Sequence, residues 1–308
     1  MIQINLKKKK NAWDTLVSNL TNKTNPIVLT TEPYVNTNNK LPFVHKNLSQ
    51  YYCKSGLEKP RAAILVHNSI DNKCWELDQF TTPDQIAIKI KHDNKEVILA
   101  STYMDINDNI PPSQTTPLIK YANDNKLPLI IGSDTNAQHK LWGNRECNKR
   151  GNDLLEWLTN LGLTWANKGS TSTFINSRGH ESIIDLTITN NHGCNLISNW
   201  KVDLNYSNSD HRYITYNITS NHHSNPRQIR LIKNTDWDRF DEYLKQNPIK
   251  NTDSYKRLDN NADLDEATQN LNKHLKQAFE YACPITYISS TIKKPPWLTP
   301  KVEEAQKT

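Results

Sequence analysis

The chain has 308 residues, of which 35% are hydrophobic and 23% are charged, and its formal net charge is +6 at pH 7. No apolar stretch approaches the ~20 residues that cross a bilayer, and residue 1 opens a strand pattern followed by lysines instead of a signal peptide, so we expect a soluble intracellular chain. The basic charge fits a polyanionic partner without requiring one.

The first elements form a strand, helix, strand unit. Residues 1–6 alternate as a strand does, and residues 27–31 form a second apolar run. Between them, one helical face carries Ala12, Leu16, Val17 and Leu20.

A hairpin-rich sheet is expected next. Residues 61–67, 85–90 and 96–103 are typical of three successive strands separated by polar turns. A helix at residues 113–123 and a buried strand at residues 127–131 follow.

A clear amphipathic helix closes the middle of the chain, where Gly162 follows an apolar face made of Leu154, Leu155, Leu158 and Leu161. Strands are expected at residues 183–189 and 213–218. Strands interspersed with helices and hairpins predict an α/β fold, a four-layer α/β sandwich in which two packed mixed sheets are flanked by helices.

The composition changes after residue 218. Thr235 is expected to cap a helix that carries Trp237, Phe240 and Leu244. A longer helix from about Asp263 has an apolar face made of Leu264, Ala267, Leu271, Leu275, Ala278, Phe279 and Ala282, and we expect both helices to bury one face. The sequence therefore predicts a domain at residues 1–218 and a partly helical linker at residues 219–308, ending in a proline-rich stretch near residues 293–297.

The five cysteines are odd in number and show neither a CxxC pair nor the spacing of a zinc site. We expect free thiols in a reducing compartment.

Polar side chains follow several of the apolar runs. Function in layered α/β folds gathers at strand ends, so these side chains predict one site assembled from much of the chain. They are Asn5, Glu32, Tyr103, Asp134 and Asp185, with Asp210 and His211 directly before the last strand.

These residue types suit metal-assisted phosphoester chemistry. Mg²⁺ takes a few carboxylate oxygens such as those of Glu32, and Asn5 is placed to bond Glu32 or the metal. Asp134 and Asn136 are spaced to orient a water between them. An imidazolium at His211 would hold a phosphoryl oxygen, and Asp185 would raise its pKa.

Taken one at a time, these residues have simpler interpretations. Glu32 can be a solvated acid in a turn, and residues 132–137 can form an Asx turn. Tyr103 can be a tyrosine packed at a strand end that donates to no phosphate. Taken together, the order of these residues along the chain favours one shared site over these separate interpretations.

Residues 1–218 resemble the endonuclease/exonuclease/phosphatase superfamily, and are most similar to the apurinic-type endonuclease domains of non-LTR retrotransposons of the arthropod kinds that insert into fixed genomic sites. The motifs that carry the resemblance are Gln3-Ile4-Asn5, Glu32-Pro33-Tyr34, Asp134-Thr135-Asn136-Ala137, Leu141-Trp142-Gly143, Arg150-Gly151, Thr173-Phe174, Ser182-Ile183-Ile184-Asp185 and Ser209-Asp210-His211.

The resemblance implies a role for each position. Asn5, Glu32 and Asp210 would bind or adjoin a metal ion, Mg²⁺ with Mn²⁺ as a substitute, and Tyr103 would contact phosphate. Asp134 and Asn136 would activate the nucleophile, Asp185 would partner the histidine, and Asp210 with His211 would close the site. Two departures are Lys7, where relatives usually carry an acid or another polar residue, and Thr31, where a glutamine is usual; the first makes a second metal position doubtful.

The sequence thus predicts a Mg²⁺-dependent endonuclease that nicks double-stranded DNA, leaves a 3′-hydroxyl and a 5′-phosphate, and primes a reverse transcriptase domain of the same polyprotein in the nucleus. A phosphatase or phosphodiesterase of the same fold acting on a small phosphoester, or an inactive DNA-binding remnant, remain alternatives. A basic surface at Arg61, Lys140, Arg145, Lys149 and Arg150 would favour DNA.

Overall fold

A computed structural model of the chain describes residues 1–20, 23–71, 73–92, 95–110, 114–219, 227–230, 235–248 and 261–288. The chain divides into two compact units, Met1–His222 and His223–Thr308. Whether residues 1–218 fold on their own stays a prediction. The proline-rich stretch near residues 293–297 lies outside the described residues.

The first sheet of the larger unit has β1 (Ile2–Asn5) near its centre. β1 runs parallel to β2 (Ile27–Thr31) and antiparallel to β14 (Tyr213–Ile218), the last strand of the unit. The sheet is completed by β13 (Ile197–Asp203) beside β14, and by β4 (Ala62–His67) and β3 (Leu48–Tyr52) beyond β2.

The second sheet is built around a parallel pair, β7 (Lys95–Tyr103) and β8 (Leu129–Asp134). β12 (Asp185–Thr189) is antiparallel to β8, with Asp185 directly opposite Asp134. The remaining strands are β5 (Cys74–Glu76), β6 (Gln85–His92) and β9 (Thr164–Trp165), and a separate hairpin joins β10 (Phe174–Ile175) to β11 (Glu181–Ser182).

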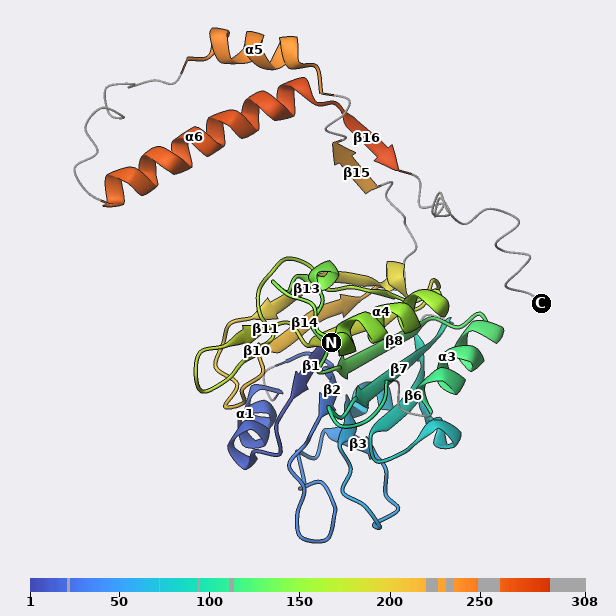
Figure 1. Cartoon of the computed structure of the whole chain (residues 1–308). Coiled ribbons are helices and arrows are strands. Elements are labelled where there is room, and N and C mark those ends of the chain that lie inside the picture. Colours follow the sequence, from blue (N-terminus) through green and yellow to red (C-terminus); the bar gives the residue numbers. More distant parts are fainter. Residues whose placement is uncertain are drawn as a thin grey trace. The chain divides into compact units, whose positions relative to one another are not determined.

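The two sheets pack face to face with helices outside, as Figure 1 shows. Apolar residues of both sheets, such as Leu29, Leu99 and Ile214, form the central core. A second cluster packs α1 (Lys10–Leu20) on the first sheet. A third packs α3 (Thr115–Asp124) and α4 (Lys149–Asn160) on the second sheet. The predicted four-layer sandwich is confirmed. The short helical turns are α2 (Asn68–Asp71), η1 (Asp78–Phe80), η2 (Lys140–Trp142) and η3 (Cys194–Leu196).

Polar contacts between the sheets hold their strand ends in register. Gln3 donates from β1 to the carbonyl of Leu186 at 3.0 Å and accepts from the hydroxyl of Thr187 at 2.8 Å. Gly132 leaves room for this approach, because a Cβ there would lie 2.9 Å from Cδ1 of Leu29 on the facing sheet. Since buried polar groups need partners, these bonds fix how β1 sits over β8 and β12.

Several strands carry no clear sequence signal. β3, β5, β9 and β13 were not predicted, and their exposed or half-buried residues explain why, since a strand at or near a sheet edge shows little apolar alternation. The helix predicted from the face of Leu154 and Leu158 is α4, which begins after Asn148, whose side chain accepts from the backbone of Gly151.

The second unit contains two helices and a two-stranded sheet, β15 (Arg227–Arg230) with β16 (Ile285–Ile288). α5 (Trp237–Gln246) packs on α6 (Asn261–Ala282), with the ring of Tyr243 5.3 Å from that of Tyr281. The cap of α5 is Asp236, not Thr235, because the Asp236 carboxylate accepts from the backbone of Arg239.

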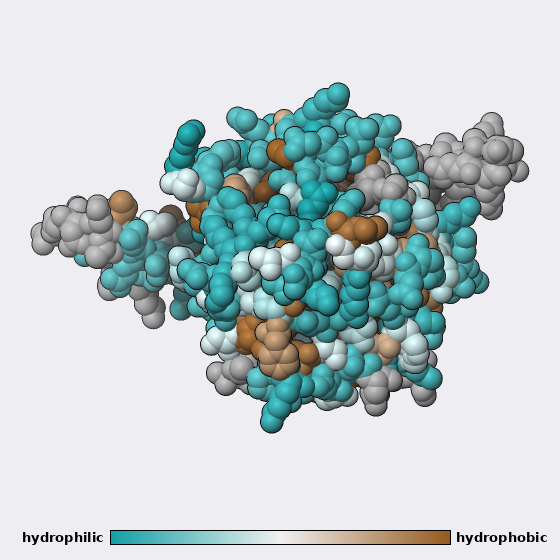
Figure 2. All heavy atoms as spheres, turned by 90° about the horizontal axis from the view of Figure 1, so that it is seen from below, coloured by the Kyte–Doolittle hydropathy of each residue, from teal (hydrophilic) through white to brown (hydrophobic). Residues whose placement is uncertain are grey.

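The apolar face predicted for α6 is only partly buried. Ala267, Ala278 and Ala282 are covered, but Leu264, Leu271 and Leu275 stay 50%, 39% and 39% exposed among the described residues. Figure 2 shows a mainly hydrophilic face of the molecule, with apolar side chains in small separate groups. None of the helices that the structure describes is both long and apolar enough for a membrane span.

Candidate active site

The site lies at one edge of the sandwich, where β1, β2 and β8 end and β12 begins. The position of Asp185 corrects one prediction. It follows Ile183 and Ile184 as predicted, but these two residues lie before the strand and do not form its end, because β12 begins at Asp185. Since β12 is antiparallel to β8, its amino end meets the carboxyl end of β8, and the two acids come together.

The side chain of Asn5 links the two principal acids. Its amide nitrogen donates to Oδ2 of Asp134 at 2.6 Å and to Oε2 of Glu32 at 3.1 Å. Its amide oxygen accepts from the backbone of Lys7 at 2.6 Å, which fixes the direction of the amide. Asn5 therefore orients both carboxylates toward one point.

Glu32 and Asn136 both have left-handed backbone conformations, with φ of 42° and 52°. Such a conformation is costly for a non-glycine residue and tends to occur where function requires it. The backbone of Glu32 is held by a hydrogen bond of 2.7 Å to the carbonyl of Arg61. The turn directs the Glu32 side chain toward Asn5, whose amide nitrogen donates to Oε2 of Glu32 at 3.1 Å.

His211 and Asp185 form a buried dyad. Nδ1 of the imidazole lies 2.8 Å from Oδ2 of Asp185, and Nε2 lies 3.9 Å from Oδ2 of Asp134. Burial alone would lower the pKa of His211, but the charge and hydrogen bond of Asp185 outweigh it and raise the pKa to about 9. Phe174 packs against the ring, with centroids 4.9 Å apart. The imidazole is thus fixed and charged at neutral pH.

Asp134 is almost fully buried, and its pKa is raised by burial and then by the nearby charge of Asp185. The backbone of Asn136 donates to its second oxygen at 3.1 Å. The Asn136 amide donates in turn to the carbonyl of Met104 at 3.2 Å. The predicted pair, Asp134 and Asn136, is therefore held in a fixed relation.

Tyr103 ends β7 directly beside Asp134 in the parallel register. Its ring is buried, and the guanidinium carbon of Arg61 lies 5.1 Å from the ring centroid. Burial and the charges of Glu32 and Asp134 raise the pKa of Tyr103, so its hydroxyl stays protonated and can donate.

Asp210 stands apart from the acid pair in its contacts. Its carboxylate oxygens accept from Lys7 and Lys9, and Lys8 pairs with Oε1 of Glu32 at 3.0 Å. The neighbouring Ser209 hydroxyl donates to the carbonyl of Asn5 at 2.8 Å, which ties this segment to β1.

All eight predicted site residues thus meet at one edge, and a contact network joins most of them directly. Among the His, Cys, Asp and Glu side chains that the structure describes, Asp134, Asp185 and His211 have possible metal-ligand atoms within 4.8 Å of one another. The ligands predicted from the sequence are Asn5, Glu32 and Asp210. Because Nδ1 of His211 is already bonded to Asp185, and a hard cation prefers oxygen, we favour the carboxylate side of the site for a metal.

The predicted basic surface needs one correction. Arg61 pairs with Asp84 and Asp105, and Arg150 donates to backbone carbonyls, among them Thr135 at 2.7 Å and Met104 at 3.0 Å. Neither guanidinium is a free cation for DNA phosphates. The other three residues of that surface, Lys140, Arg145 and Lys149, are exposed.

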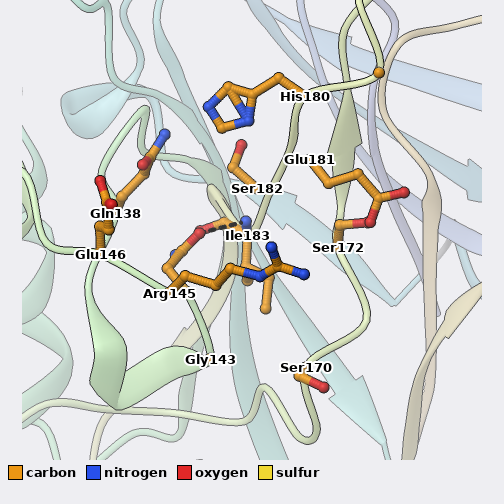
Figure 3. A pocket seen from close by; sticks show the side chains of 12 residues that line it. Gln138, Gly143, Arg145, Glu146, Ser170, Ser172, His180, Glu181, Ser182 and Ile183 are labelled. Carbon is orange, nitrogen blue, oxygen red and sulfur yellow. Dashed lines mark hydrogen bonds between the residues drawn. The ribbon is translucent and has the colours of Figure 1, made fainter.

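A polar pocket of about 730 Å³ adjoins this edge, between the loop after β8 and the β10–β11 hairpin. In Figure 3 the Arg145 side chain extends toward the segment that carries Ser182 and Ile183, which leads into β12. Asn144 fixes that segment, since its side chain donates to the carbonyl of Ile183 and accepts from its backbone nitrogen. The pocket is therefore bounded by the same segments that hold the site.

Several positioning residues were missed. Gln3 joins the sheets, Arg150 holds the loop of Asn136, and the hydroxyl of Thr173 accepts from the backbone nitrogens of Ile184 and Asp185. Each lies within a recognisable motif. The residue type alone does not distinguish a polar side chain that holds the backbone by hydrogen bonds from one that is exposed at the surface. Only the fold supplies their partners.

Comparison with known proteins agrees with this geometry. Residues 97–215 match a family described as endonuclease-reverse transcriptase. A probable RNA-directed DNA polymerase from transposon BS of Drosophila melanogaster is 25% identical over 211 residues, which is 67% of this chain and 22% of the relative. The chain thus spans about a fifth of that protein.

Two solved structures are also similar. The endonuclease domain of TRAS1, a telomere-specific non-LTR retrotransposon, is 30% identical with a TM-score of 0.59, and the match covers 70% of this chain and 96% of that domain. An AP endonuclease of Leishmania major shares the fold at 10% identity, with a TM-score of 0.57 over 71% of this chain and 87% of that one. The chain therefore belongs to the family of non-LTR retrotransposon endonuclease domains and is a phosphodiesterase nuclease.

Proposed function

We propose that the chain is a Mg²⁺-dependent endonuclease that nicks one strand of double-stranded DNA and leaves a 3′-hydroxyl and a 5′-phosphate. One observation carries the proposal. A buried carboxylate, Asp134, is bonded to Asn5 at 2.6 Å and lies 3.9 Å from the free nitrogen of a charged imidazole, His211. A proton acceptor and a cation that face one point are what in-line attack of water on a phosphodiester needs.

Asp134 accepts the proton of the attacking water. Its raised pKa makes the carboxylate a stronger base than an exposed aspartate. Asn136 has its backbone on the second oxygen of Asp134 and its side chain fixed on Met104, so it limits the directions from which water can approach.

His211 stabilises the charge that develops on the phosphoryl oxygens. Asp185 occupies Nδ1 and keeps the ring protonated, so Nε2 remains to donate a charge-assisted hydrogen bond. Tyr103, protonated and next to Asp134, donates to the same phosphate.

The donor set fits a hard divalent cation. Glu32 and Asp134 are acids bonded to one amide, and burial and the charge of Asp185 raise the pKa of Asp134, so like charges gather at one edge. Glu32 and Asn5 are the residues proposed to hold or adjoin the ion. When bound, Mg²⁺ supplies charge neutralisation at the phosphate and at the departing 3′-oxygen.

The partners follow from the family. We propose that the substrate is target DNA in the nucleus, and that the 3′-hydroxyl left by the nick primes a reverse transcriptase domain of the same polyprotein. The exposed cations Lys140, Arg145 and Lys149 support a DNA substrate, because a small phosphoester needs no extended track of phosphate contacts.

Incubation of the chain with supercoiled plasmid and Mg²⁺ tests the activity. Nicked circles are expected, and a chelator should abolish them. Mn²⁺ should replace Mg²⁺, whereas Ca²⁺, which is larger and looser in coordination, should support cutting poorly. Intact supercoiled plasmid in Mg²⁺, together with measurable DNA binding, would favour an inactive remnant.

The product ends test the chemistry. A DNA polymerase should extend the nick directly, without phosphatase treatment, since the leaving group is the 3′-oxygen. A nick that is extended only after dephosphorylation would contradict both the mechanism and the priming role.

A further inference from the structure

We propose that Lys7 is a further catalytic residue, whose ammonium group contacts the scissile phosphate, and that Asp210 acts as its anchor. This inference rests on the proposed function. It assigns Asp210 a positioning role in place of the metal contact predicted from the sequence.

The backbone after β1 is built to present lysines at the site. The backbone nitrogen of Lys9 donates to the carbonyl of Leu6 at 2.9 Å, and φ is 50° at Lys7 and 57° at Lys8. Two successive positive φ values are a feature of the type I′ turn, which favours Asn-Gly and strongly disfavours long side chains. The fold tolerates lysine where glycine or asparagine would cost less, which points to a use for the side chains.

The Lys7 ammonium lies on the histidine side of the site. It contacts the Asp210 carboxylate and stands 5.8 Å from the centroid of Phe174, whose ring is 4.9 Å from that of His211. Its side chain is 46% exposed, so an incoming phosphate can reach it. Lys7 and His211 therefore both lie close to the Phe174 ring, which places two cations near the same edge.

The charges around Asp210 favour an anchor. Lys7 and Lys9 supply two ammonium groups to one carboxylate, the second at 2.6 Å, which leaves one positive charge in excess beside the site. The two ammonium groups already balance the charge of the Asp210 carboxylate and disfavour a further cation beside it, whereas an ammonium with three donors can serve the carboxylate and a phosphate together. The backbone nitrogen of Lys7 also bonds Asn5, so the residue is fixed at both ends.

The test uses the full chain, a labelled duplex and single-turnover nicking, with four single variants and one double variant. Lys7→Gln and Asp210→Asn remove the two partners, and Lys7→Arg restores the charge. Lys10→Gln is the matched control, because Lys10 follows in the same lysine run but pairs with Asp14 on α1. Lys7→Gln is expected to slow nicking about 10- to 100-fold, the effect of one charge-assisted hydrogen bond, whereas Lys7→Arg keeps most of the rate and Lys10→Gln all of it.

Double-variant analysis separates an anchor from a metal ligand. The variant that carries both Lys7→Gln and Asp210→Asn should be no slower than either single variant, since the two residues act as a unit. Calorimetry with Mg²⁺ alone should show the same affinity for wild type and Asp210→Asn. Lower Mg²⁺ affinity of Asp210→Asn, or recovery of its rate at high Mg²⁺, would overturn the anchor role.

A binding measurement gives a readout that does not depend on catalysis. In Ca²⁺, the slope of log K for DNA against log salt should fall by about 0.9 in Lys7→Gln, the value for one lost phosphate contact, and remain unchanged in Lys10→Gln. A Lys7→Gln variant that nicks and binds like Lys10→Gln would refute the inference while leaving the proposed function intact. Failure of the wild type to nick at all would instead count against the proposed function.

Discussion

Replacement of Asp185 by asparagine should move the pH dependence of nicking without moving the histidine. Asparagine has the same shape and its amide oxygen can still accept from Nδ1 of His211, but the negative charge 2.8 Å away is lost. That charge is what raises the pKa of His211 to about 9 against the effect of burial. An opposite charge at this distance is worth roughly 1–3 pKa units, so we expect the pKa to fall by about 2 units.

The sign and size of the effect follow directly. A raised pKa keeps the imidazole charged to higher pH. Loss of the Asp185 charge therefore moves the alkaline limb of the rate profile to lower pH. At pH 8 a pKa near 9 leaves about 90% of the imidazole charged, and a pKa near 7 leaves about 10%, a difference of about tenfold in rate. The acid limb should also move to lower pH, because the charge of Asp185 raises the pKa of Asp134, the proposed base.

Single-turnover nicking from pH 5.5 to 9.5 is the assay. Asp14→Asn is the control, because Asp14 is an exposed acid of α1 paired with Lys10. An alkaline limb that stays in place in Asp185→Asn, or a loss of rate that is equal at every pH, would refute an electrostatic role of Asp185 through His211.

Three further outcomes are expected. Asp134→Asn should lower the nicking rate by orders of magnitude, because an amide cannot accept the proton of the attacking water, and single-turnover nicking at pH 8 checks it. Arg150→Lys should lower the nicking rate about tenfold or more with an unchanged DNA-binding salt slope, because lysine lacks the fork that holds the carbonyls of Thr135 and Met104. Residues 1–218 should unfold cooperatively and nick DNA, and a truncated chain that does neither would place the later residues in the core.

The sequence predicted the buried strands of the two sheets well, because each of these strands is marked by a local run of apolar residues. The runs that became β1, β2, β7 and β8 are buried along their length and therefore read as apolar. Edge strands such as β3 and β13 are half solvated, so no alternation revealed them.

The sequence predicted which residues form the site better than it predicted how they are placed and paired. Asp185 was placed after an apolar run, Ile183 and Ile184, and these two residues lie before β12, which begins at Asp185, because the bounds of a strand are not evident from two apolar residues. Arg61 and Arg150 were expected to face DNA, and they bind carboxylates and carbonyls instead. A sequence shows charged residues, whereas their partners, such as Asp210 for Lys7 at a separation of 203 residues, are evident only in the fold.

The pairing of β1 with β14 has a consequence for the nascent chain. β1 finds one of its two neighbours only when residues 213–218 have been made, and Asn5 meets Asp134 only across 129 residues of chain. Such distant pairing forms late and slowly. A chain still under synthesis, or one that terminates before His211, carries acids but no imidazole beside them. The site is therefore incomplete until His211 has been made, and it can form from that point on.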